Sequence, residues 1–217
     1  MKKELIDKAI SEIENPTFAT TKQYLGVHSV ELENGKPKVE RVDFESFDQT
    51  NAVYFPIQNE LFFLVVYFNK ENNDLNGVGT ENGHKVYLTA TSEHLTYNDL
   101  SELTKLKPLS GWSKNDLRIN GKSKHTFSRI SFEPIKSQAY DLGQKLKLLL
   151  DELEKDKSGV KNLTQKADAY ISVCSHIFIE GNKGIVLDRE IIKKMSDLNL
   201  SIGIAQYVQG NEFKSII

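Results

Sequence analysis

Apolar and polar residues are spaced first as in a helix and then as in strands. Residues 2–14 carry apolar side chains at helical spacing and are followed by Asn15-Pro16, so we predict an amphipathic helix that ends there. Between residues 24 and 47, apolar side chains alternate with polar and acidic ones on both sides of Asn34-Gly35. An Asn-Gly pair between two such arms is typical of a two-residue turn, so this stretch is predicted to form a β-hairpin.

A second strand pair follows, and a polar segment then interrupts the pattern. Residues 52–57 and 61–68 are predicted to pair, and the second of these is apolar on both faces, which is typical of a central strand. Pro56 restricts the first strand to an edge or an irregular position. Residues 69–84 are rich in Asn and Gly and are predicted to be a long loop or a boundary. We therefore expect an N-terminal part, 1–80, and a C-terminal part, 81–217, which can also form one continuous fold.

The C-terminal part contains the sequence strand, helix, strand twice. Thr96 and Asp188 are the predicted N-caps, with the Leu95–Leu100 and Leu187–Ile192 pairs as hydrophobic staples. The segments of the first unit are 85–94, 95–108 and 125–132, and those of the second are 170–179, 187–200 and 200–208.

A strong helix is predicted between the two units, at residues 140–156. Its leucines form one apolar stripe, and Asp141 and Lys145 are spaced to form an ion pair. The sequence thus predicts an α+β protein. An N-terminal helix and antiparallel strands precede two βαβ units joined by a helix, with a tendency to the ferredoxin-like arrangement.

Composition narrows the class of protein. The chain has 217 residues, of which 39% are hydrophobic, enough for a substantial core. Its longest apolar run, residues 61–68, is far shorter than the roughly 20 residues of a membrane-spanning helix, and the N-terminus lacks the pattern of a secretory signal. Cys174 is the sole cysteine, which excludes an intramolecular disulfide. We expect a cytoplasmic protein that does not enter membranes.

Charge is distributed unevenly along the chain. Residues 1–84 have eight basic and fourteen acidic residues, a net charge of −6, whereas residues 85–217 have twenty and sixteen, a net charge of +4. The basic half is only weakly basic and its lysines are dispersed, so nucleic-acid binding is not expected. Two solvated surfaces of different sign explain this asymmetry without a partner.

Motifs for catalysis are absent from the sequence. It contains no G-x-G-x-x-G, phosphate-binding loop, H-E-x-x-H or G-x-S-x-G, and no two of its five histidines are three or four residues apart. Cys174 and His176 face the same side of a predicted strand, but roughly 7 Å separates such positions, too far for a nucleophile pair. His94 is interpreted as leading into the Thr96 cap. No catalytic residue, metal ligand or cofactor is predicted.

Acidic side chains gather around the first hairpin, and two uses are open. They are a solvated strand face, or a docking surface for a basic protein, whose opposite charge would speed association. The residues assigned to this surface are Glu31, Glu33, Asp43, Glu45 and Asp48.

Trp112 lies in the stretch KPLSGWSKND, residues 107–116. A tryptophan beside Lys114 and Asp116 could stack on a ligand or anchor a partner. The alternative, which we favour, is that it folds over a helix end and closes the core, with its indole N–H bonded to a nearby carbonyl.

A family resemblance covers residues 85–213. The stretches VYLTATSEHLTYNDLSELTKLKPLSGWSKND and GIVLDREIIKKMSDLNLSIGIAQYVQGN contain a strand, a capped helix, a loop with a GW pair and a closing strand. This pattern resembles the domain-of-unknown-function family DUF4279. The chain departs from it at Asn115, where glycine is expected, and at Gln206, where an acidic residue is expected. The resemblance implies a small, soluble bacterial protein, and immunity partners of secreted toxins are among the roles it suggests.

Two functions of different classes follow. The first is a non-enzymatic binding protein, such as an immunity protein that neutralises a toxin by docking on it. The acidic hairpin would suit a basic toxin. The second is a small enzyme or ligand-binding protein with a pocket near Trp112, Lys114 and Asp116, which packing of His94 or His125 against this loop would favour.

Overall fold

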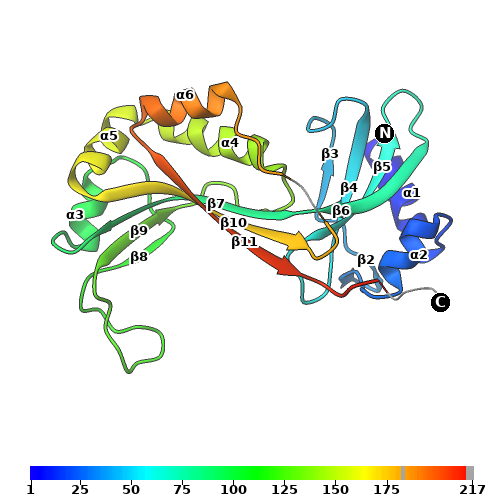
Figure 1. Cartoon of the computed structure of the whole chain (residues 1–217), viewed down its shortest axis with the longest axis horizontal. Helices are drawn as coiled ribbons and strands as arrows, with labels where there is room; N and C mark the ends of the chain where they lie inside the picture. Colours follow the sequence, from blue (N-terminus) through cyan, green and yellow to red (C-terminus); the bar gives the residue numbers. More distant parts are fainter. Residues whose placement is uncertain (182–183, 214–217) are drawn as a thin grey trace.

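A nearly continuous strand path connects the two lobes of the molecule (Figure 1). The structure is a computed structural model and describes residues 1–181 and 184–213. β6 (Leu75–Glu81) belongs to one sheet and β7 (Gly83–Ser92) to the other, with only Asn82 between them. The prediction of a loop over 69–84 is therefore wrong for most of its length. Because Gly77 and Gly79 have no side chains, β6 lacks the alternation that would have indicated a strand. It is a strand because its backbone pairs with the apolar β5.

The N-terminal lobe packs two helices against a four-stranded antiparallel sheet of order β3-β4-β5-β6. The predicted first helix and the pairing of the two apolar strands are confirmed. The Asn-Gly turn is also confirmed, but the hairpin is much shorter than predicted: only residues 32–37 form it, because residues 41–43 pair with β4 instead. Leu5 and Ala9 of α1 are fully buried in the same cluster as Phe55 and Val66 of the sheet. The elements are α1 (Lys2–Glu14), α2 (Ala19–Leu25), β1 (Leu32–Glu33), β2 (Lys36–Pro37), β3 (Arg41–Asp43), β4 (Thr50–Pro56) and β5 (Phe63–Asn69).

The C-terminal lobe is built on a five-stranded sheet of order β11-β10-β7-β9-β8. β7 is antiparallel to both β9 and β10, and β8 is antiparallel to β9, so β8 runs parallel to β7. The chain from β7 to β10 therefore follows the β-α-β-β-α-β arrangement of ferredoxin-like folds. The predicted ferredoxin-like tendency is confirmed, but the strands that form it are not the ones predicted. β11 extends this sheet, parallel to β10. The strands are β8 (Ser110–Trp112), β9 (Ser128–Phe132), β10 (Asp168–Phe178) and β11 (Ser201–Gln209).

Four helices lie on one face of this sheet (Figure 1). The leucine stripe of α4 is buried as predicted, together with Val86, Leu88, Ile171 and Val173 from β7 and β10. On the opposite face, alternate residues of β10 such as Tyr170 remain partly exposed. The helices are α3 (Tyr97–Glu102), α4 (Leu142–Glu154), α5 (Lys157–Lys166) and α6 (Arg189–Asp197).

Local signals predicted the N-caps of α3 and α6 correctly, but α3 ends at Glu102 and not at the predicted stop, Pro108, and not every strand partner was predicted. Thr96 and Asp99 form a complete capping box, and the Asp188 side chain caps α6 by accepting from the Ile191 N–H at 2.8 Å. The strand predicted at 125–132 was expected to run parallel to β7, but β9 is antiparallel to it and β8 is the strand that runs parallel. β8 was not predicted, because three residues are too few to show an alternation of apolar and polar side chains. Ile192, the predicted staple partner of Leu187, is 54% exposed.

Lys145 lies inside the protein instead of pairing with Asp141. Its side chain is fully buried, and its ammonium group donates to the carbonyl oxygens of His84 and Ser137, both at 2.6 Å. Burial lowers the pKa of Lys145 to about 8. The Lys145 side chain thus joins α4, through hydrogen bonds, to the start of β7 and to the segment that precedes the helix.

Other contacts cross the predicted division at residues 80/81. Phe178, from the end of β10, is buried in the N-terminal core cluster. Beyond β11, the Asn211 N–H donates to Nε2 of His28 at 3.0 Å, and its side-chain amide donates to the Val27 carbonyl at 3.0 Å. The two sheets thus lie on either side of that boundary, but the lobes share buried side chains.

Candidate protein-binding surfaces

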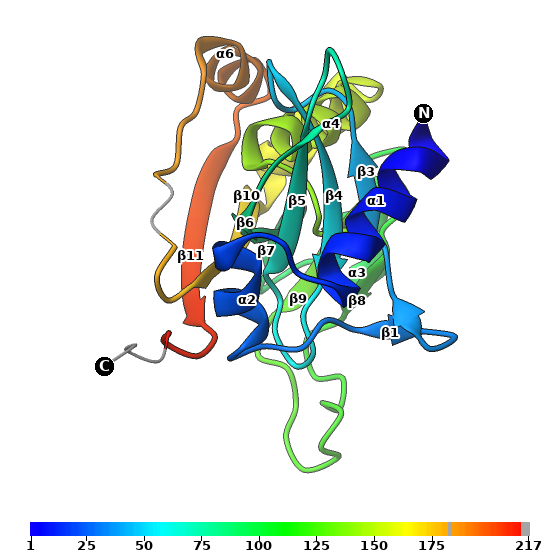
Figure 2. The ribbon, with the colours of Figure 1, turned by 90° about the vertical axis from the view of Figure 1, so that its right-hand side faces the viewer.

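The acidic residues expected to form one surface are divided among separate places. Glu33 is exposed on the β1–β2 hairpin, where Glu31 pairs with Lys38 at 2.9 Å. Glu45 and Asp48 are exposed in the β3–β4 connection. The two views show this hairpin and this connection at opposite ends of the N-terminal lobe (Figures 1 and 2).

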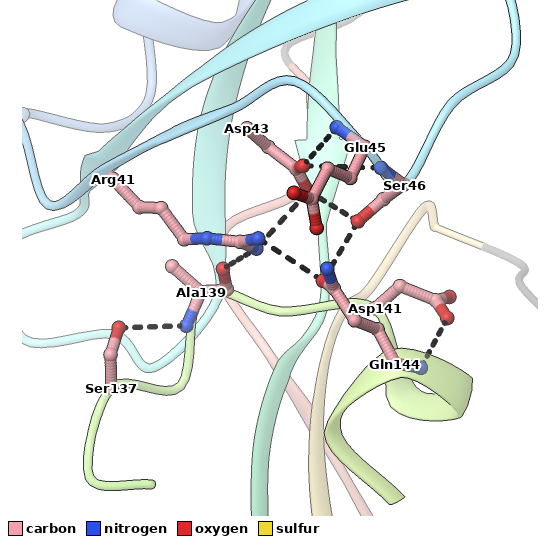
Figure 3. A network of polar contacts seen from close by, with 8 residues as sticks. All are labelled: Arg41, Asp43, Glu45, Ser46, Ser137, Ala139, Asp141 and Gln144. Atoms are coloured by element: carbon pink, nitrogen blue, oxygen red, sulfur yellow. Dashed lines mark hydrogen bonds and ion pairs between the residues drawn. The ribbon is translucent and has the colours of Figure 1, made fainter. Parts of the chain in front are cut away.

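Asp43 is 1% exposed and belongs to a buried network (Figure 3). Its carboxylate accepts hydrogen bonds from the Glu45 N–H at 2.8 Å and from the Ser46 N–H and hydroxyl, and it pairs with Arg41 at 3.1 Å. Burial alone would raise its pKa, but the bonds from Ser46 and Glu45 and the Arg41 charge hold the pKa of Asp43 below its ordinary value. Asp43 therefore has a structural role and cannot contact a partner.

Arg41 connects this network to the other lobe. Its guanidinium donates to the Ala139 carbonyl at 2.8 Å and to the Gln144 side chain at 3.1 Å, and it stacks over the Tyr140 ring at 3.6 Å from the centroid. The planar guanidinium suits both contacts, because it can donate in its plane and stack on its face.

A second surface is the connection between β8 and β9, residues 113–127, which we call the β8–β9 arm. It projects away from the sheet in both views (Figures 1 and 2). Backbone hydrogen bonds cross it from Asn115 to His125 and from Arg118 to Ser123, at 2.9 and 2.8 Å, and a bridge pairs Leu117 with Lys124. The arm is therefore a hairpin whose two sides are joined by backbone hydrogen bonds.

The base of the arm brings together the three residues singled out in the sequence. Trp112 donates its indole N–H to the Phe127 carbonyl at 3.0 Å, as predicted, but it is absent from the core cluster and stacks on His125 at 4.2 Å. The core-plug interpretation of Trp112 is thus wrong. The Lys114 ammonium donates to the Glu93 carbonyl at 3.2 Å, and the Asp116 carboxylate accepts from the Ser113 N–H at 2.7 Å.

Asn115 explains one departure from the family pattern. Its φ angle is +75°, in the left-handed region that favours glycine. Asparagine is among the few other residues that adopt this conformation readily. Asn115 therefore adopts a backbone conformation that the expected glycine could also adopt.

The tip of the arm exposes large apolar side chains. Leu117 is 65% exposed and Ile119 is fully exposed. Lys114, Arg118, Lys122 and Lys124 outnumber the single acidic residue Asp116, so the arm has a net charge of +3. An exposed apolar pair on a basic, hydrogen-bonded hairpin is a surface suited to binding.

An open depression lies next to the arm. It has a volume of about 520 Å³, and its lining includes Glu93, His94, Phe127 and Asp168. His94 itself is exposed, and its N–H donates to the Ser92 hydroxyl at 3.1 Å, in keeping with its predicted place before the helix cap. The depression thus joins one of the sequence candidates to the arm.

Residues 1–181 and 184–213 contain no group of three or more His, Cys, Asp or Glu side chains able to hold a metal ion. Within this part of the chain, no helix is long and apolar enough to cross a membrane. Cys174 and His176 are both half-buried on the uncovered sheet face, where His176 stacks on Tyr207 at 5.2 Å.

The exposed pair at the tip was not recognised from the sequence. Asn120-Gly121 was the available signal, because it is the same turn pair that identified the first hairpin. The Gly121 N–H bonds to the Arg118 carbonyl at 2.8 Å and closes the turn.

The fold defines an α+β protein with a ferredoxin-like sheet extended by one strand and a projecting basic arm. Residues 82–209, more than half of the chain, match the family model described as Domain of unknown function (DUF4279). The chain belongs to this family, and the resemblance noted in the sequence is confirmed. Neither the curated proteins nor the solved structures contain a match.

Proposed function

We propose that this chain is a protein-binding protein without catalytic activity and that it docks on its partner through the β8–β9 arm. The carrying observation is the exposure of Leu117 and Ile119 on an ordered hairpin. Holding such side chains rigidly in water lowers the entropy cost of binding.

The chemistry of the arm suggests the kind of partner. An apolar pocket would take the tip side chains, and an acidic rim around it would attract Arg118, Lys122 and Lys124. Two apolar side chains are few for stable membrane anchoring, and nucleic-acid binding uses phosphate contacts and stacking, which Leu117 and Ile119 do not provide. An acidic protein surface therefore fits best.

This proposal moves the docking surface away from the acidic hairpin. Glu31 and Glu33 are separated from Glu45 and Asp48, and Asp43 is buried, so these residues offer no single acidic patch. An immunity protein that blocks a toxin by docking would be one member of the proposed class, with an acidic rather than a basic contact surface on the toxin.

The test is affinity capture with the full chain and two matched variants. Leu117→Ser/Ile119→Ser should weaken binding of a stoichiometric partner about 30-fold or more, because even one central hot-spot residue costs at least about 2 kcal/mol. Leu32→Ser/Leu61→Ser removes exposed apolar side chains elsewhere and should bind like the wild type. A partner retained equally by all three proteins would contradict the proposal, as would capture only by anionic vesicles or nucleic acid.

A second candidate function is binding of a small polar ligand in the depression beside the arm. Its volume of about 520 Å³ lies in the range of ligand pockets, and His125 stacks on Trp112 close by. Glu93 and Asp168 in the lining favour a cationic or hydroxyl-rich ligand.

Ligand binding there would change the fluorescence of Trp112, the only tryptophan. A screen of small polar metabolites would use this fluorescence change. For a ligand of this site, the dissociation constant should rise about tenfold or more in Glu93→Ala/His94→Ala, because hydrogen bonds to charged groups are worth about 1.5–3 kcal/mol. Glu102→Ala/Lys107→Ala is the control. Signals unchanged in both variants would place the ligand elsewhere.

A further inference from the structure

β11 presents an unusually open sheet edge. It is the last strand in the order β11-β10-β7-β9-β8, so among the described residues only one of its edges is paired. Residues 203–208 are all exposed, including Ile204, Tyr207 and Val208. Both faces of the strand and its outer edge are therefore in contact with water.

The sequence of β11 lacks the features that usually protect an edge. SIGIAQYVQ contains no charged residue and no proline, and its nine residues are long for an edge strand. Edge strands of this kind pair readily with another strand, since their unpaired backbone N–H and C=O groups form a template.

We propose that β11 pairs antiparallel with β11 of a second copy of this chain, in a register centred on Ala205. A twofold axis perpendicular to the sheet would then pass midway between the two Ala205 residues and keep the helices of both copies on the same side. One sheet would run through the dimer from β8 of one copy to β8 of the other.

The strand is self-complementary in this register. Gly203 lies opposite Tyr207 of the second copy, a small residue facing a large one, and Ile202 lies opposite Val208. Because the strand carries no charge, pairing it with itself opposes no like charges. A foreign strand has no comparable reason to match these positions.

A neighbouring apolar depression supports the same register. It has a volume of about 590 Å³ and is lined by residues of α6 and the start of β11, among them Ile192, Met195, Leu200 and Ile202. In the proposed pair, Val208 of the second copy stands beside Ile202 at the border of this depression. Val208 is 63% exposed and Ile192 is 54% exposed, so dimerisation would cover both.

Sedimentation of the full chain over a range of concentrations tests the dimer. The wild type should dimerise, and Val208→Lys should raise the dissociation constant about tenfold or more, because each dimer loses two buried valines. Leu32→Lys, which replaces an exposed apolar side chain far along the chain, is the matched control and should dimerise normally. A wild type that stays monomeric, or a dimer unaffected by Val208→Lys, would overturn the proposal.

Disulfide trapping tests the register. Cys174 lies beside Ala205 on the adjacent strand, so it is first replaced by serine to prevent an intramolecular bond. In that background Ala205→Cys should form a covalent dimer under mild oxidation, since residues directly opposite in an antiparallel pair lie within disulfide distance. Ser201→Cys, which would face Gln209, should cross-link poorly. Preferred cross-linking at Ser201→Cys would refute the register.

The dimer and the proposed arm function are tested separately. The β8–β9 arm is connected to β8 and β9, and β11 lies at the other end of the strand order. Val208→Lys should therefore leave partner capture intact, and Leu117→Ser/Ile119→Ser should leave sedimentation intact. Failure of one proposal does not affect the other.

Discussion

Replacing Lys145 with alanine should lower the free energy of unfolding by about 3–5 kcal/mol. The substitution removes two buried hydrogen bonds and leaves a cavity in a packed helix interface. The Lys145 side chain is fully buried and donates to the carbonyls of His84 and Ser137. Denaturation in urea measures the loss. Since the total free energy of unfolding of such domains is about 5–15 kcal/mol, the variant should lose a large fraction of its stability.

The charge and the volume of Lys145 can be separated. Lys145→Met keeps most of the volume and removes a buried charge, so it should cost clearly less than Lys145→Ala. An equal loss in both variants would show that the hydrogen bonds alone stabilise the site. A loss below about 1 kcal/mol in Lys145→Ala would contradict the proposed role.

Lys145 also gives the stability a specific pH dependence. Its pKa is about 8 in the folded chain and 10.5 in an unperturbed lysine. Between these values the unfolded chain holds the proton and the folded chain releases it, so stability rises with pH across this window. Between pH 8 and 10.5, the free energy of unfolding of the wild type should rise relative to that of Lys145→Met by up to about 1.4 kcal/mol per pH unit. Below pH 8, the difference between the two free energies should stay constant.

Arg41→Ala should be the second most damaging substitution, with a loss of about 2–4 kcal/mol. It removes the donors to Ala139 and Gln144 and leaves the buried Asp43 carboxylate without its cation. Three other hydrogen bonds to Asp43 remain in this variant. The expected loss of unfolding free energy is therefore smaller than the largest losses seen when a buried ion pair is broken. Thermal unfolding and urea denaturation measure the effect.

An exposed ion pair provides the control for Arg41. Lys38 and Glu31 pair at 2.9 Å on the surface, so Lys38→Ala should cost at most about 1 kcal/mol. In a double-mutant cycle, Arg41→Ala/Asp43→Ala should lose less than the sum of the single losses, because no buried charge is left alone. Additive losses would show that the two side chains act independently.

Local signals in the sequence predicted the helices and the paired strands. The leucine stripe of α4 and the capping box at Thr96 depend on residues within one or two turns, so the structure has them as expected. Lys145 also gave a usable signal, since it lies three residues after Leu142 and four before Leu149, on the apolar stripe itself. Pairing it with Asp141 overlooked that position.

Features that depend on distant parts of the chain were missed. β6 and β8 become strands because β5 and β9 pair with them, and neither has the alternation that would show this locally. The same applies to the candidate site. Trp112, Lys114 and Asp116 were singled out because they lie in one short stretch of sequence. The exposure of Leu117 and Ile119, by contrast, follows from how the arm projects from the sheet.

The shared core has a consequence for the order in which the chain folds during synthesis. Strands β3 to β6 leave the ribosome early, yet the cluster they build also contains Phe178, and His28 receives its hydrogen bond from Asn211. The N-terminal lobe therefore cannot complete its packing until Phe178 and Asn211 have emerged from the ribosome. Until β10 has been translated, the part of the N-terminal core that Phe178 covers stays exposed to solvent.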